Sequence, residues 1–264
     1  MLETLLTLAV AHVLAGFLLQ TRWILDRKPK PDGFLLHIAI VGAAACLIAG
    51  TRDPRVLGVI ILTHAAVHWA KLRWIASGAT PEARKARDGL PVFLIDQLLH
   101  LAAVVAVAIL YPSTVADGWW GGLPAEQQRF YFRVLCVVGG VVLAVSTGDG
   151  VIDKYLAGFG AHRDAVSPTP GQTPNPPNQS SQTSLGLPGG GQAIGCLERG
   201  MTLLFLLIGQ PDGVGLLLAA KSILRFSDAN ARAHTEYVII GTLLSFGWAI
   251  VSAILTRTAL QHWS

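Results

Sequence analysis

Long apolar stretches alternate with short polar loops along most of the chain. Several of these stretches reach the roughly 18 to 20 residues that a helix needs to cross the hydrocarbon core of a bilayer. Backbone groups in lipid must be satisfied within the segment, so we expect helices rather than open strands. Eight spans are predicted near residues 4–24, 34–50, 56–76, 91–111, 130–148, 193–209, 212–227 and 235–256. The sixth and seventh are short and contain glycines, so a re-entrant pair is an alternative there, and the predicted count is seven to eight spans.

Composition supports the same fold class. The 264 residues are 52% hydrophobic and 14% charged, whereas about a quarter of the residues in a soluble domain are charged. We therefore predict an all-α, polytopic transmembrane helical bundle of about eight spans. The net charge of +4 resides in short loops, as in membrane proteins, which argues against nucleic-acid binding. Three isolated cysteines form no CxxC pair and are expected to be small buried hydrophobes.

One segment differs sharply from the rest. The stretch SPTPGQTPNPPNQSSQTS, within residues 163–192, is rich in Pro, Ser, Asn and Gln. Such a segment has no apolar face to bury and is expected to be a flexible linker. The predicted organisation is a five-span part at 1–160, a linker at 161–192 and a three-span part at 193–264.

Loop charges predict the orientation. The loops at 22–33 and 72–90 are rich in Lys and Arg, whereas the 112–129 loop has few. The positive-inside rule then places the first two loops and the linker in the cytoplasm and both termini outside. The N-terminus lacks the features of a cleaved signal peptide, so its first apolar stretch is expected to be retained.

Two pairs of metal-ligand residues lie inside separate predicted spans. His64 and His68 in one span, and Asp96 and His100 in the next, are each four residues apart and therefore share a helix face. Polar groups in a bilayer are costly unless they have partners, and imidazole with carboxylate suits Zn²⁺ or a similar first-row cation. We predict a metal site at these four residues, and a purely structural hydrogen-bond network is the alternative.

Two further histidines lie in the first two predicted spans. His12 and His37 are candidates for catalytic roles, because a remaining His beside an ion-bound water can act as a general base. For either residue alone, structural packing is an equally good interpretation. Gln20 and Gln97 are expected to orient these groups or to pack helices.

A second polar set lies in the C-terminal part. Lys221 and Arg225 share a helix face and could bind an anionic lipid headgroup as a cofactor-type ligand. The alternative is that they are snorkelling cations neutralised by Glu198 or Glu236.

Four motifs carry a family resemblance. AHVLAGFLLQTRW at 11–23, LLHIAI at 35–40, HAAVHWAK at 64–71 and FLIDQLLH at 93–100 resemble a bacterial membrane family catalogued as domain of unknown function 3307, over roughly residues 8–105. This implies a bacterial inner-membrane protein with a His/Asp site of the kind assigned by pattern to metal-dependent hydrolases. Gly16 and His68 stand where the family usually has Asp, and imidazole at His68 shifts the expected metal towards Zn²⁺. The matching polar positions are His12, Gln20, His37, His64, Lys71, Asp96, Gln97 and His100.

Three functions remain open from the sequence. The leading hypothesis is an integral membrane metalloprotein that hydrolyses a lipid or polyprenyl-linked substrate at the bilayer. The second is a transporter or channel for a metal ion, a proton or a small anion. The third is a non-enzymatic scaffold with a structural metal. Membrane lipids are the expected partners, and formation of a homo-oligomer is left open.

Overall fold

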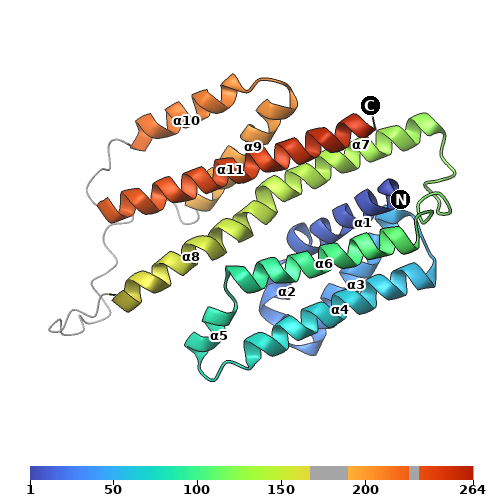
Figure 1. Cartoon of the computed structure of the whole chain (residues 1–264), viewed down its shortest axis with the longest axis horizontal. Helices are drawn as coiled ribbons and strands as arrows, with labels where there is room; N and C mark the ends of the chain where they lie inside the picture. The colour runs from blue at the N-terminus through green and yellow to red at the C-terminus, as the bar shows by residue number, and fades with distance from the viewer. Residues whose placement is uncertain (167–189, 226–231, 264) are drawn as a thin grey trace.

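The computed structural model describes the backbone of residues 1–166, 190–225 and 232–263, with side chains for 1–158, 190–223 and 239–263. Every regular element in these ranges is a helix, as predicted (Figure 1). The elements are α1 (Leu2–Val13), the π-helical turn η1 (Leu14–Leu18), α2 (Arg22–Arg27), α3 (Pro31–Ala49), α4 (Pro54–Ala76), α5 (Pro81–Arg87), α6 (Leu90–Leu110), α7 (Ala125–Val142), the π-helical turn η2 (Leu143–Thr147), α8 (Gly148–Val166), α9 (Gly190–Leu207), α10 (Asp212–Arg225) and α11 (Arg232–His262).

Five helical segments in the described part are long and apolar enough to cross a membrane. They expose large apolar side chains such as Leu62 (70%) and Leu98 (64%), which suits contact with lipid rather than water. The protein is therefore a polytopic helical membrane protein. The five segments are Pro31–Ala49, Pro54–Ala76, Leu90–Leu110, Ala125–Gly158 and Ile239–His262.

The other three predicted spans also form helices, but shorter or more polar ones. The first ends at Leu18 rather than near residue 24, because Thr21 starts a new helix by accepting a hydrogen bond from the Ile24 amide. Helix α9 contains Glu198 and Arg199. Helix α10 has 14 residues, a length of about 21 Å that is too short for a typical hydrocarbon core.

The predicted fifth span is part of a longer helix. Helices α7 and α8 run on through η2, so the helix continues past residue 148 to Val166, inside the stretch predicted as linker. The carboxyl end of that linker is helical as well, since α9 begins at Gly190. Residues 167–189 of the linker lie outside the described residues.

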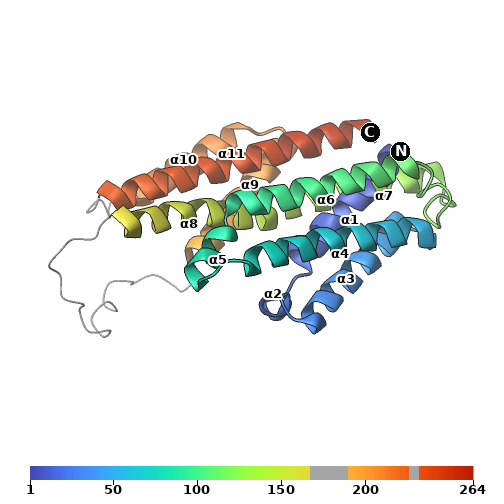
Figure 2. The same cartoon turned by 60° about the horizontal axis from the view of Figure 1, so that its bottom comes forward.

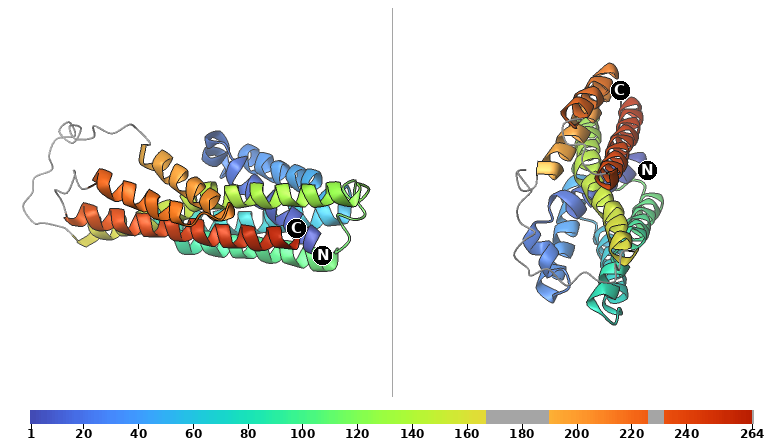
Figure 3. Two further views of the ribbon diagram at one scale, coloured as in Figure 1. Left: turned by 90° about the horizontal axis from the view of Figure 1, so that it is seen from above. Right: turned by 90° about the vertical axis from the view of Figure 1, so that its left-hand side faces the viewer.

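The helices form two groups that lie side by side. Helices α1, α3, α4 and α6 form one group, and α9 and α11 pack on the long α7–α8 helix in the other (Figures 1 and 2). Helices α2 and α5 lie at the end of the bundle opposite to the two termini, which end close to each other (Figures 1 and 3). The two basic loops thus lie on the same side, as the orientation prediction requires.

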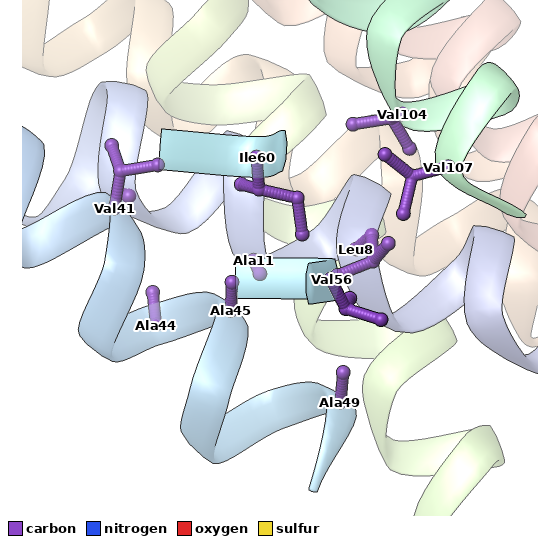
Figure 4. Close-up of a cluster of buried hydrophobic side chains, with 11 residues drawn as sticks. Leu8, Ala11, Val41, Ala44, Ala45, Ala49, Val56, Ile60, Val104 and Val107 are labelled. Atoms are coloured by element: carbon purple, nitrogen blue, oxygen red, sulfur yellow. The ribbon is translucent and has the colours of Figure 1, made fainter. Parts of the chain in front are cut away.

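Small side chains allow the first group to pack closely. Its core brings Ala11 of α1 against Ala44, Ala45 and Ala49 of α3, with Leu8, Val41, Val56, Ile60, Val104 and Val107 filling the centre (Figure 4). Without a hydrophobic driving force between helices in lipid, such close van der Waals contact is a main source of association.

A Gly139–Gly140 pair in α7 joins the two groups. A methyl group at Gly139 would lie 2.8 Å from Cγ2 of Val10 in α1, and one at Gly140 would overlap the Thr256 hydroxyl of α11. Helix α7 therefore needs glycine at both positions to touch a helix on each side.

This contact predicts the effect of one substitution. Gly140→Ala forces α7 away from α11 and should lower the free energy of unfolding in detergent by about 1–3 kcal/mol, the usual range for overpacking. Gly150→Ala is the matched control, because a methyl at Gly150 meets nothing within 4 Å. Thermal unfolding of both variants checks the prediction, and equal stability would contradict it.

Candidate functional site

Five histidines from four helices meet inside the first group. The ring centroids of His64 (α4) and His100 (α6) are 4.2 Å apart, and those of His37 (α3) and His68 (α4) are 5.1 Å apart. His12 of α1 stacks on His100 at 4.9 Å. Four of the rings are buried, with His37 only 2% exposed. All five were predicted from the sequence as site residues, and the structure brings them together.

Hydrogen bonds link these rings to the predicted amides. Nε2 atoms of His37 and His64 are 3.0 Å apart, and Gln20 Nε2 lies 3.2 Å from Nδ1 of His37. Gln97 Oε1 lies 3.3 Å from His12 Nε2. Gln20 reaches His37 because the chain leaves η1 at Leu18 instead of continuing as a helix. The two glutamines thus orient two of the histidines, as expected.

Asp96 provides the negative charge of the cluster. Its Oδ2 accepts hydrogen bonds from Lys71 Nζ at 3.1 Å and from Gln97 Nε2 at 2.9 Å. His100 Nδ1 lies 2.7 Å from the carbonyl oxygen of Asp96 and 3.7 Å from its Oδ1. The side chains of Asp96 and Lys71 are only 7% and 16% exposed, so their charges neutralise each other away from solvent.

Three buried atoms of the cluster have no hydrogen-bond partner among the described residues. They are Nε2 of His68, Nε2 of His100 and Oδ1 of Asp96. A buried polar atom without a partner costs about 1–3 kcal/mol, so such atoms usually have a ligand, an ion or a water. All three belong to residues predicted from the sequence to bind metal.

The fit to a metal ion is partial. Two nitrogens on one tetrahedral Zn²⁺, each bonded at about 2.0–2.1 Å, lie about 3.3 Å apart, close to the 3.0 Å between His37 and His64. No three His, Cys, Asp or Glu side chains of the described part, however, form a group that could hold an ion. Binding of an ion would thus require side-chain movements that bring a third ligand into place.

A small cavity adjoins the cluster. It measures ≈ 20 Å³ and is lined by His12, His64 and His100 on one side, which is room for about one water or ion. The apolar core residues Leu8, Val41, Ile60 and Val104 line the other side (Figure 4). In the observed conformation the polar cluster therefore stops at mid-bundle.

Basic groups gather at the opposite end of the cluster. Lys71 lies near the end of α4 that leads to α5, and Lys28 lies between α2 and α3. Burial, with added repulsion from Lys71, lowers the pKa of Lys28 to about 8. Sequence reasoning missed Lys28, because a lysine in a polar loop carries no pattern that distinguishes it from its neighbours.

The predicted C-terminal pair lies elsewhere. Lys221 Nζ is 2.6 Å from Oε2 of Glu198, and α10 packs mainly on α9. The structure therefore separates Lys221 from the histidine cluster, and the side chain of Arg225 lies outside the described residues. The glutamate that neutralises Lys221 is one of the two expected partners, and the side chain of the other, Glu236, is not described.

The same region holds a buried ion pair that the sequence did not predict. Arg199 is 3% exposed, and its guanidinium donates to Oδ1 of Asp149 at 3.0 Å and to the Val145 carbonyl at 3.1 Å. Asp149 lies one turn before Asp153, and this i, i+4 pair of carboxylates was the available signal.

These features define a polytopic membrane protein with a histidine cluster inside its helical bundle. A family model described as "Protein of unknown function (DUF3307)" matches residues 4–118, a range that contains the whole cluster. The match confirms the resemblance predicted from the four motifs. Comparison with curated proteins and with solved structures found no match.

Substitution of Lys71 tests whether the Lys71–Asp96 ion pair is buried. Lys71→Met leaves a buried carboxylate without its cation and should lower the free energy of unfolding by roughly 3–5 kcal/mol. Lys154→Met removes an equally short pair with the more exposed Asp88 and should cost at most about 1 kcal/mol.

The double variant Lys71→Met/Asp96→Asn removes both charges, and we expect it to recover part of the loss. Thermal unfolding in detergent measures all three variants. Equal destabilisation by Lys71→Met and Lys154→Met would show that the pair is not effectively buried.

Proposed function

We propose that this chain is an integral membrane metalloprotein whose histidine cluster binds a divalent first-row cation, with Zn²⁺ preferred. The observation that carries the proposal is the set of unpartnered buried atoms on His68, Asp96 and His100. A cation satisfies the lone pairs of an imidazole nitrogen and of a carboxylate oxygen together.

The activity we propose is hydrolysis of a lipid or polyprenyl-linked substrate at the bilayer. A bound Zn²⁺ with an open position lowers the pKa of a bound water to near 7. His12 lines the cavity that has room for about one water and is the candidate general base, held by Gln97. His37 does not line this cavity; bonded to both Gln20 and His64, it is a positioning residue.

The position of the cluster in the bundle favours a hydrolase over an open channel. The polar residues extend from the α2–α5 end to mid-bundle, where the apolar core closes the other side. A cluster that extends towards one end of the bundle suits a substrate that arrives from the membrane surface. We place the basic end in the cytoplasm of a bacterial inner membrane, following the loop charges.

A second candidate is transport of a metal ion or proton. The observation that favours it is the linked series of polar groups across four helical elements, from Gln20 through His37 to His64 and from Lys71 through Asp96 and Gln97 to His12. Transport would require a second conformation in which the apolar core around Leu8 and Val104 opens.

Metal content is the first test. Detergent-purified wild type should hold a stoichiometric amount of Zn²⁺, and His68→Ala and His100→Ala should lose it, because each removes a proposed ligand. His262→Ala is the matched control, since His262 lies at the end of α11 and contacts Trp263. Elemental analysis of folded, monodisperse samples measures the metal, and metal-free wild type would overturn the proposal.

Turnover separates the two activities. In Zn²⁺-loaded proteoliposomes the hydrolase should release products from bilayer lipids or polyprenyl phosphates. His12→Ala should retain its metal but lose about 10²–10⁴-fold in kcat, the usual contribution of a general base.

A Zn²⁺-sensitive dye or a pH-sensitive dye inside the same vesicles measures flux. Flux that is lost in His64→Ala, with no product released by the wild type, would support transport and contradict hydrolysis. His262→Ala should behave as wild type in both assays.

A further inference from the structure

A large cavity lies between α8, α9, α10 and α11, away from the histidine cluster. Its volume is ≈ 730 Å³, within the usual range for small-molecule sites. Apolar side chains from three helices form much of its wall, with Ile152 and Leu156 from α8, Met201 from α9 and Leu217 from α10. An apolar wall offers water few hydrogen-bond partners, so this part of the cavity suits a hydrocarbon group.

The buried charges on the cavity wall already have partners. Lys221 Nζ is 2.6 Å from Oε2 of Glu198, and the guanidinium of Arg199 is 3.0 Å from Oδ1 of Asp149. Asp153 is exposed, so solvent hydrates its carboxylate. Among the described residues, the wall thus leaves no buried charge for a ligand to neutralise. The apolar side chains, rather than a polar group, therefore select the ligand.

Membrane-spanning helices border the cavity. Residues of the segments Ala125–Gly158 and Ile239–His262, both long and apolar enough to cross a bilayer, contribute to its wall. Lys154 of α8 pairs with Asp88, which comes just before α6, so this part of α8 lies near the end of the spans. The cavity is therefore at the level of the bundle where the chains of a membrane lipid begin.

The cavity also reaches an apolar part of the protein surface. Ile194 (55%), Leu197 (65%) and Met201 (41%) of α9 are exposed while they line the cavity. Exposed apolar side chains beside membrane spans contact lipid rather than water. The hydrocarbon group nearest to this opening is therefore the acyl chain of a bilayer lipid.

We infer that this cavity holds an acyl chain of a membrane phospholipid, and that the chain rather than the headgroup determines binding. The chain enters past Leu197 and Met201 of α9 and packs against Ile152, Leu156 and Leu217. Van der Waals contacts with the chain replace those that the wall of an empty cavity would lose. The lipid is then part of the packing between α8, α9 and α10. This site does not depend on the metal or on the activity proposed for the histidine cluster.

Native mass spectrometry of the full chain in detergent tests the inference, with dioleoyl phosphatidylethanolamine, phosphatidylcholine and phosphatidylglycerol added in equal amounts. Wild type should retain a phospholipid, with similar amounts of the three headgroups. Dihexanoyl phosphatidylcholine, which has the same headgroup as one of the dioleoyl lipids but short chains, should not be retained.

Two substitutions fill the cavity from different helices. Met201→Trp in α9 and Ala220→Trp in α10 keep every charge, and both variants should lose the retained lipid because these residues line the cavity. Leu204→Trp is the matched control, because Leu204 of α9 is 54% exposed and does not line the cavity. Added dioleoyl phosphatidylcholine should raise the Tm of wild type and of the control, but not that of the two filled variants.

Wild-type retention of the lipid by folded Met201→Trp and Ala220→Trp would overturn the inference. Equal retention of the dihexanoyl and dioleoyl lipids would overturn it as well, because chain length would then not matter. A preference for phosphatidylglycerol alone would show selection by the headgroup, and would restore the anionic site expected at Lys221 and Arg225.

Discussion

The constraint that shapes the N-terminal group is that a carboxylate and several imidazoles lie inside lipid-exposed helices. Water cannot satisfy them there, so each polar atom needs a partner from the protein or from a ligand. Lys71 neutralises the charge of Asp96. Gln20 orients the ring of His37, and Gln97 orients the ring of His12. Nε2 of His68, Nε2 of His100 and Oδ1 of Asp96 remain without a partner among the described residues. These atoms make the cluster a candidate ion site.

The helix geometry around the cluster follows from the same need. The π-helical turn η1 and the break after Leu18 let Gln20 turn towards His37; π-helical turns occur frequently at functional sites. Beyond the cluster, alanines allow α1 and α3 to approach closely, and the apolar core seals the far side of the cavity. Close packing on one side and polar groups on the other thus set the depth to which a water or ion can penetrate.

The C-terminal group solves the problem of buried charge differently. There, Arg199 forms an ion pair with Asp149, and Lys221 forms one with Glu198. Both pairs line a cavity that is much larger than the one at the histidines. The Gly139–Gly140 contact joins α7 to helices of both groups. The two regions therefore share one scaffold but differ in chemistry: imidazoles and one carboxylate gather in the first, and paired charges line a large cavity in the second.

The sequence alone determined the helical membrane class and the pairs His64/His68 and Asp96/His100, because apolar length and i, i+4 spacing are local properties of the chain. The sequence did not determine the number of full-length spans. Helices α1, α9 and α10 have an apolar composition, but the positions at which they end depend on their surroundings. Tertiary structure alone decided that His12 and His37 join the cluster and that Lys221 does not, because these relations depend on which helices pack together. The pairing of Arg199 with Asp149, 50 residues apart, likewise arises only when α8 and α9 come into contact.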